Sequence, residues 1–441
     1  MSVLERVQLA SGQGEQDAVR ASMLREAREQ LKRDLIGALG LSTVAKMLAE
    51  NEDRARTELG VTLDALCNSG DYADVLLAEK SLLISQVIDE VCGLGPIQPL
   101  LDDPTITEVM INGTQALFYE RDGELFQADI AFDSEEQILI VMDKILAPLG
   151  RRLDRSNPIV SARLPNGDRV NAVASPVAVD GTSVTIRKFS AQIRTLESLV
   201  ELAALPGWYA QLLSWAVKAR ASIAVCGGTG SGKTTLLNAL SCEISHKERL
   251  VTVEDSAELR FDAHPNVVRL EAQEASIEGR GETTIRELVK NALRMRPDRI
   301  VVGECRGEEA IDMLQAMNSG HPGSLTTLHA GSAQESILRL VLMARFGMDL
   351  PADVIEEQIA TAIDLVVMAR RLADGSRVIS DLTEVSRGER GQVELRRIVS
   401  FDLARREWRL EGEPAFLGRS VGEGILDAEE VEAWKQSCCW G

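Results

Sequence analysis

The stretch GGTGSGKTT, residues 227–235, decides how this chain folds. It follows the apolar run SIAVC (222–226) and precedes LLNALSCEI (236–244), whose apolar spacing predicts an amphipathic helix. A glycine, four residues and then Gly-Lys-Thr, placed between a strand and a helix, form the pattern of a phosphate-binding loop. Pumps, kinases, helicases and assembly motors all use such loops, so neighbouring residues must narrow the function.

The residue types in this loop suit the phosphates of ATP and a Mg²⁺ ion. Glycines let backbone N–H groups converge on phosphate oxygens, and the following helix adds the positive end of its dipole. We expect Lys233 to reach the β- and γ-phosphates and the Thr234 hydroxyl to ligate Mg²⁺. The predicted nucleotide-binding residues of the loop are Gly228, Thr229, Gly230, Ser231, Gly232, Lys233, Thr234 and Thr235.

Acidic residues follow two further apolar runs. RIVVGECRG (299–307) carries Glu304 at the end of a predicted buried strand, where sites in parallel sheets lie. A carboxylate there can orient the water that attacks the γ-phosphate, although capping of the next helix is the simpler alternative. EDSAEL (254–259) offers Glu254, Asp255 and Glu258, and spacing alone does not choose among them.

Two of the four histidines bracket GHPGSLTTLHA (320–330). A lone histidine is more often structural than catalytic. His329, however, ends a predicted core strand and is therefore well placed to sense the γ-phosphate. No histidines and thiols fall at zinc-ligand spacing.

Composition narrows the class of protein. The 441 residues carry a net charge of −20, which disfavours nucleic acid as the main ligand. No window approaches the roughly 18 uninterrupted apolar residues of a membrane span, and the first residues lack the pattern of a secretory signal. Seven cysteines without CxxC pairs argue against a disulfide framework, and adjacent Cys438 and Cys439 have no evident role. We therefore expect a cytoplasmic protein.

The residue pattern, and with it the predicted secondary structure, changes along the chain. Helical spacing dominates the N-terminal part, which ends in the Gly/Pro-punctuated segment GLGPIQPLLDDP (93–104). Short strand-like runs follow, with hairpin turns at RDGE (121–124) and PNGD (165–168) and one helix capped by Ser134 and stopped by Gly150. Strands then alternate with helices, which predicts an α/β fold with a mostly parallel sheet. The predicted regions are 1–92, helical; 93–192, α+β; 193–385, nucleotide-binding; and 386–441, a strand pair and tail.

Four landmarks stand in a fixed order: GGTGSGKTT, VTVEDSAEL, RMRPDRIVVGECRGEEA and SGHPGSLTTLHA. This order resembles the Walker A, Asp box, Walker B and His box of the secretion ATPase superfamily, and the resemblance covers about residues 93–385. Within it, the helical N-terminus, SIEGRGETTIRELVKNALRMRPDRI (276–300) and AMNSGHPGSLTTLHA are most similar to the CpaF-like Tad (Flp) pilus assembly branch. The tetracysteine zinc module of type II secretion enzymes and pilus extension motors is absent from this sequence.

The resemblance implies a RecA-like ATPase domain preceded by a PAS-like α+β domain, and roles for particular residues. Glu304 corresponds to the general base, and Glu258 to the carboxylate near the metal, supported by Glu254. The N-terminal domain is expected to lend arginines to the triphosphate. The candidates are Arg169 and Arg187, with Arg163 as a weaker one.

The resemblance also implies a homohexameric motor that hydrolyses ATP while docked on inner-membrane pilus platform proteins. Its contact with the membrane would be indirect, and no direct contact with nucleic acid is expected. Domain closure over ATP would pivot at 93–104 and around 193–198. Two alternatives stay open: a conjugative type IV secretion ATPase, and a scaffold that binds nucleotide without hydrolysing it.

Overall fold

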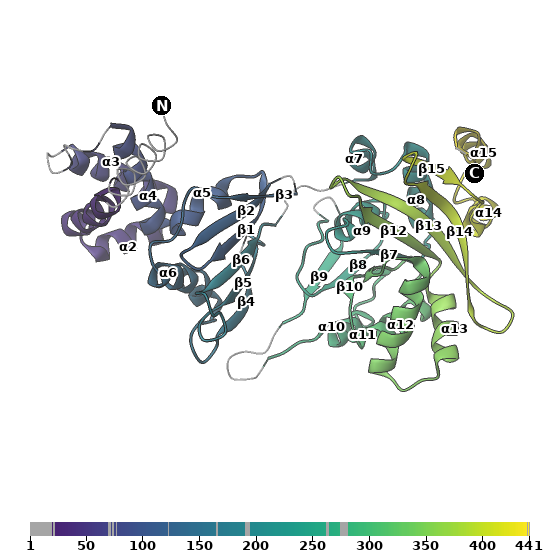
Figure 1. Cartoon of the computed structure of the whole chain (residues 1–441). Coiled ribbons are helices and arrows are strands. Elements are labelled where there is room, and N and C mark those ends of the chain that lie inside the picture. Colours follow the sequence, from purple (N-terminus) through teal and green to yellow (C-terminus); the bar gives the residue numbers. More distant parts are fainter. Residues whose placement is uncertain are drawn as a thin grey trace, which may run out of the picture. The chain divides into compact units, whose positions relative to one another are not determined.

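The computed structural model describes residues 20, 23–68, 72, 75, 77–121, 123–164, 166–189, 195–261, 264–273, 281–438 and 440. Parts of three predicted features lie outside these residues: the stretch 276–282, the second hinge and Cys439. The chain forms two compact units, Met1–Phe189 and Ser190–Gly441, which are described separately (Figure 1). Among the described residues, no helix combines the length and apolar character needed to span a bilayer.

The first unit begins with helices, as predicted. Residues 23–39 are helical, and α2 (Leu41–Glu50), α3 (Glu52–Cys67) and α4 (Leu77–Cys92) follow. Apolar side chains at helical spacing, including Leu31, Leu35, Leu59, Leu63 and Val87, are buried together between these helices. The amphipathic pattern of the sequence therefore builds a separate small core.

A six-stranded sheet completes the first unit, with strand order β3-β2-β1-β6-β5-β4 and antiparallel neighbours throughout. Its strands are β1 (Ile106–Asn112), β2 (Ala116–Arg121), β3 (Glu124–Gln127), β4 (Ile159–Arg163), β5 (Arg169–Val173) and β6 (Ser183–Arg187). The other elements are η1 (Gly95–Ile97), α5 (Gln98–Asp102), α6 (Glu135–Leu146) and η2 (Ala147–Leu149). Helix α6 packs its apolar side on one face of this sheet.

The predicted hairpin pairing and helix cap of this unit are confirmed. Strands β2 and β3 pair as a hairpin around RDGE, and β4 and β5 do so around PNGD. The hydroxyl of Ser134 accepts a hydrogen bond from the Gln137 N–H at 3.2 Å and caps α6. Gly150 follows η2 with φ 68°, a left-handed conformation that glycine adopts without a steric penalty.

The second unit contains a nine-stranded sheet of order β15-β14-β13-β12-β7-β11-β10-β8-β9. From β12 to β9 the neighbours are parallel, and β13 to β15 continue antiparallel from β12. The strands are β7 (Ile223–Gly227), β8 (Leu250–Glu254), β9 (Val267–Glu271), β10 (Arg299–Cys305), β11 (Leu325–His329), β12 (Leu365–Arg371), β13 (Arg377–Arg387), β14 (Val393–Asp402) and β15 (Glu407–Leu410). The predicted mixed α/β fold class is confirmed.

Helices cover both faces of this sheet, because its central strands are apolar on both sides. One core contains Ile223 and Val225 of β7 and side chains from α7 (Leu196–Glu201), α8 (Gly207–Lys218), α9 (Lys233–Cys242), α14 (Ala415–Gly422) and α15 (Ala428–Ser437). The other contains Ala224 and Cys226 and side chains from α10 (Ile285–Ala292), α11 (Glu309–Asn318), α12 (Ala333–Gly347) and α13 (Ala352–Ala362). Alternate residues of β7 thus face opposite cores.

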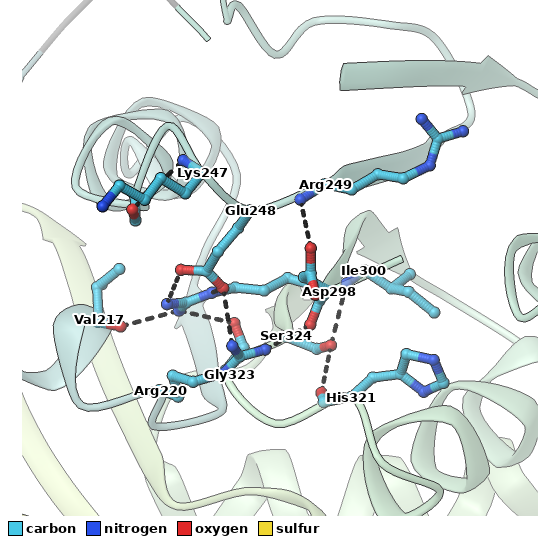
Figure 2. A network of polar contacts seen from close by, with 12 residues as sticks. Val217, Arg220, Lys247, Glu248, Arg249, Asp298, Ile300, His321, Gly323 and Ser324 are labelled. Carbon is cyan, nitrogen blue, oxygen red and sulfur yellow. Dashed lines mark hydrogen bonds and ion pairs between the residues drawn. The ribbon is translucent and has the colours of Figure 1, made fainter. Parts of the chain in front are cut away.

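A polar network ties together the segments that lead into four parallel strands (Figure 2). Arg299, whose side chain is 1% exposed, opens β10 and pairs with both carboxylate oxygens of Glu248, at 2.8 and 2.9 Å. It also donates to the carbonyl oxygens of Val217 and Gly323, at 2.9 and 3.3 Å. This network fixes the amino ends of the strands, and the phosphate-binding loop lies at their carboxyl ends.

Candidate active site

The phosphate-binding loop links β7 to α9 in the second unit. Strand β7 is buried along its whole length, and α9 begins at Lys233. Gly230 and Gly232 have φ of 69° and 93°, values that residues with a Cβ rarely adopt. The loop therefore needs glycine at these positions to bring its backbone N–H groups inward.

The carbonyl oxygen of Gly228 is the meeting point of the loop's donors. It accepts hydrogen bonds from Lys233 Nζ and Ser231 Oγ, both at 2.9 Å, and a longer one of 3.4 Å from the Ser231 N–H. These groups are the ones predicted to hold phosphate oxygens. Lysine and serine are thus already aimed at one oxygen atom inside the loop.

Two parallel strands end beside Lys233. The register pairs His329, the last residue of β11, with Gly227, the last of β7, while Glu304 lies near the end of the neighbouring β10. His329 Nε2 lies 3.3 Å from Lys233 Nζ and 2.9 Å from Glu304 Oε1. The approach to Glu304 Oε1 does not have the geometry of a hydrogen bond, and it becomes an ion pair only when the imidazole is protonated. The structure therefore brings these three predicted residues together.

Burial, followed by the positive charge of Lys233, lowers the pKa of the His329 imidazole below its usual 6.5. The imidazole is therefore neutral at neutral pH and has one N–H group to place. A neutral ring between an ammonium and a carboxylate can shift its hydrogen bonding from one to the other.

Glu254 ends β8 and is the most enclosed carboxylate of the site, with 2% of its surface exposed. Its Oε2 accepts hydrogen bonds from the N–H groups of Glu258 and Leu259, at 2.7 and 3.0 Å. Burial raises the pKa of Glu254 above 4.5, and these two hydrogen bonds oppose the rise. The structure therefore places Glu254 beneath the segment that carries Glu258.

The oxygen donors beside the loop fit Mg²⁺. Oε1 of Glu254 is buried and accepts no hydrogen bond from any described residue. An orphaned buried carboxylate oxygen needs a partner, and a cation or a cation-bound water supplies one. Glu254 and the half-buried Thr234, the second residue of α9, therefore offer the oxygen chemistry that Mg²⁺ prefers.

Sequence reasoning missed Arg306. Its Nη2 donates to Glu304 Oε2 at 2.6 Å, and its Nη1 lies 3.5 Å from Asp255 Oδ2. Arg306 therefore joins the segment after β8 to the end of β10. The signal was present in ECRG, because Arg306 follows the last strand residue, Cys305, and lies only two positions after Glu304.

The three arginines predicted to serve the triphosphate lie in the first unit and form one row. The strand register pairs Arg163 with Arg169, and Arg169 with Arg187. Their neighbours Val170 and Ile186 are buried toward α6, so the arginines occupy the opposite face of the sheet. The structure thus collects the three guanidinium groups on one surface.

Comparisons with known proteins identify the class. The chain belongs to the family described as Type II/IV secretion system protein, whose model matches residues 90–399. The predicted superfamily is therefore confirmed, and the protein is an ATPase.

The chain is also similar to individual proteins. The chain is 37% identical over 307 residues to a Mycobacterium tuberculosis protein provisionally described as a conjugal transfer protein, covering 68% of this chain and 86% of that one. It is 38% identical over 301 residues to the type IV secretion system protein VirB11 of Brucella suis, covering 62% and 83%. The crystal structure of that VirB11 ATPase is 34% identical with a TM-score of 0.37, covering 66% and 92%. The pilus retraction motor PilT is 18% identical with a TM-score of 0.48, covering 78% and 89%.

Proposed function

We propose that this ATPase is a homohexameric motor that powers assembly of a Tad (Flp)-type type IV pilus or a related secretion system. The observation that carries the proposal is the convergence of Lys233, His329 and Glu304 beside the phosphate-binding loop. The Tad branch rests on the motif resemblance. The proposal includes a RecA-like arrangement of the second unit and a PAS-like α+β domain in the first.

Binding of ATP replaces one set of contacts by another. Lys233 Nζ and the Ser231 hydroxyl leave the Gly228 carbonyl and turn to phosphate oxygens. The exchange is favourable because a charge-assisted bond to phosphate is stronger than a bond to a neutral carbonyl. His329 lies between Lys233 and Glu304, so its hydrogen bonding changes when Lys233 turns to the phosphate, and this change reaches the Glu304 carboxylate.

Glu304 acts as the general base that orients the attacking water. Arg306 holds one carboxylate oxygen at 2.6 Å, so the other oxygen, on the His329 side, is the one that faces the water. Positioning of this kind supplies most of the catalysis in phosphoryl transfer.

Thr234 and Glu258 would hold the Mg²⁺ ion, and Glu254 Oε1 would accept a hydrogen bond from water bound to it. When bound, the ion would neutralise charge on the phosphates. The hydrogen bond from the Glu258 N–H to Glu254 Oε2 fixes the backbone that carries Glu258. Glu254 thereby links the end of β8 to the proposed metal site.

The arginine row of the first unit completes the site when the two units close on ATP. Developing charge on the phosphates is well matched by guanidinium groups, which form paired hydrogen bonds. We propose that Arg169 and Arg187 contact the triphosphate and that Arg163 assists. Residues 93–104 and 193–198 serve as the hinges, so hydrolysis becomes a rotation between units.

The proposed setting is the cytoplasmic side of the inner membrane. The motor meets integral platform proteins there, and contact with the membrane passes through them. In a ring, closure in one copy after another turns or ratchets the base of the pilus.

Glu304→Gln tests the motor against the nucleotide-gated scaffold. Loss of the general base should lower phosphate release by about 100-fold or more while ATP binding persists. Pilus assembly should then stop in cells that carry the variant. A scaffold predicts normal assembly by this variant, and that outcome would contradict the proposal.

The hexamer is tested by mass and by dilution. Light scattering with an ATP analogue should give six times the mass of 48.1 kDa. Activity per molecule should fall on dilution if neighbouring copies are needed for turnover. A monomer with constant specific activity at all concentrations contradicts the ring.

A second candidate is a conjugative type IV secretion ATPase, favoured by the identity to the mycobacterial protein described above. The net charge of −20 weighs against direct DNA contact. Filter binding with single- and double-stranded DNA at moderate salt separates the candidates. Tight binding to either form favours the conjugative role, and its absence together with a pilus defect in Glu304→Gln favours the pilus motor.

A further inference from the structure

The hairpin of β12 and β13 packs directly against the phosphate-binding loop. A Cβ added to Gly227 would collide with the carbonyl oxygen of Ala369 on β12. A Cβ on Gly230 would lie 3.8 Å from Arg371 Nη1, and one on Gly232 would lie 3.6 Å from Arg377 Cδ. Two arginine side chains of the hairpin therefore lie along the loop.

The strand register places these arginines directly opposite each other. Arg371, the last residue of β12, pairs with Arg377, the first of β13. Like charges in a direct cross-strand pair destabilise a hairpin. Two adjacent guanidinium groups beside the phosphate-binding loop therefore concentrate positive charge there, in a chain of net charge −20.

Arg377 also sets the direction of a loop peptide. Its Nε donates to the carbonyl oxygen of Gly230 at 2.9 Å. In a trans peptide the C=O of Gly230 and the N–H of Ser231 point in opposite directions. Holding this oxygen therefore turns the Ser231 N–H away from Arg377 and toward the loop interior, where its present bond to Gly228 is a long 3.4 Å.

The hairpin is built to hold its shape. The Leu372 N–H donates to the Ser376 carbonyl at 2.8 Å, and Asp374 accepts hydrogen bonds from the Ser376 N–H and hydroxyl. Arg406 pairs with Asp374 from the turn before β15. The two guanidinium groups thus stand on a braced turn, which lowers the entropy lost on binding an anion.

We propose that Arg371 binds the phosphate chain of the nucleotide and that Arg377 positions the loop for it. This inference rests on the proposed function, because it concerns the same nucleotide. It adds a source of positive charge within the second unit, distinct from the arginine row of the first. Nucleotide affinity then depends on the hairpin even before the two units close.

The test uses the full-length chain and a fluorescent ATP analogue in the presence of Mg²⁺. Arg371→Ala and Arg377→Ala should each raise the dissociation constant at least tenfold, with unchanged melting temperatures. Arg377→Lys should recover most of the affinity, because lysine can also donate to the Gly230 carbonyl. Arg370→Ala is the matched control: it removes a neighbouring exposed arginine on β12 that points to the other side of the strand.

Wild-type affinity in Arg371→Ala would overturn phosphate binding by Arg371. Failure of Arg377→Lys to recover affinity would overturn the positioning role of Arg377. Comparing AMP with ATP checks that Arg371 contacts the phosphate chain, because Arg371→Ala should then raise the dissociation constant of ATP more than that of AMP. These experiments measure nucleotide binding alone, so they test this inference separately from the proposed motor. The proposed motor would instead be contradicted if the wild-type chain bound ATP without hydrolysing it.

Discussion

Nε2 of His329 lies 2.9 Å from Oε1 of Glu304, at the carboxyl ends of two neighbouring parallel strands. The same nitrogen is 3.3 Å from Nζ of Lys233. A single imidazole thus stands between the lysine predicted to hold the γ-phosphate and the carboxylate predicted to act on water. Any change of charge at the lysine alters the field at the carboxylate.

His329→Asn should separate nucleotide binding from turnover. Asparagine keeps a polar group near Lys233 but cannot span the distance to Glu304. We expect kcat to fall about 10- to 100-fold, within the usual range for a positioned polar group, with a smaller change in KM. Steady-state phosphate release measures both constants. A change in KM alone would remove His329 from the link to Glu304.

The pH profile offers a second readout for His329. The pKa of this imidazole lies below 6.5, because burial and Lys233 disfavour its charged form. Protonation at lower pH places a second cation beside Lys233 and ties up Glu304 in an ion pair. The wild type should therefore lose activity as pH falls below 6.5, and His329→Asn should lack this step in kcat against pH.

Glu254→Gln should stabilise the protein while impairing hydrolysis. Burial raises the pKa of Glu254 above 4.5, so between 4.5 and this raised value the folded state binds more protons than the unfolded state. The free energy of unfolding therefore falls as pH rises through that window, and the cost persists at pH 7. Glutamine removes this cost and still accepts the two backbone hydrogen bonds.

Denaturant titrations at pH 7 and at pH 4 should thus differ. The variant should be more stable than the wild type at pH 7, and the advantage should vanish below about pH 4.5. If the variant and the wild type were equally stable both at pH 7 and at pH 4, water rather than apolar surroundings would solvate the Glu254 carboxylate.

The arginine row yields a prediction with an internal control. Arg169→Ala and Arg187→Ala together remove two adjacent guanidinium groups, and kcat/KM for ATP should fall by about 100-fold, the effect expected when charge-matched donors are lost. Arg54→Ala, on α3 of the same unit, removes an exposed arginine engaged with Glu58 and should leave turnover unchanged. Full turnover in the double variant would refute closure of this face on the triphosphate.

The sequence predicted the α/β class, the hairpins of the first unit and the loop residues, because these depend on local patterns. It did not predict β9 or α13. Strand β9 is a short edge strand that is only half-buried, and α13 is an amphipathic helix that buries Ile355, Ile359 and Ala362. Arg306, Arg371 and Arg377 were also missed. Their importance arises from strand register and from contacts between residues distant in sequence, such as Arg377 with Gly230, 147 positions apart.

The acidic residues that follow β8 show what spacing alone leaves open. Spacing left Glu254, Asp255 and Glu258 equivalent, whereas in the fold they differ sharply. Glu254 is buried with an orphaned oxygen, and Asp255 is exposed toward Arg306. Only the path of the chain after β8 separates them.

Glu248→Ala should cost the second unit about 3–5 kcal/mol of its unfolding free energy, because it leaves the buried Arg299 guanidinium without its carboxylate. The side chains are 1% and 14% exposed, so water cannot take over from the missing carboxylate. The carbonyls of Val217 and Gly323 remain, but neither carries a full charge.

All five tryptophans lie in the second unit, so their fluorescence in urea follows its unfolding alone. Glu357→Ala breaks the half-exposed pair with Arg387 and should cost at most about 1 kcal/mol. Similar losses in both variants would show that the polar network at the amino ends of the strands is solvated and does not hold the sheet together.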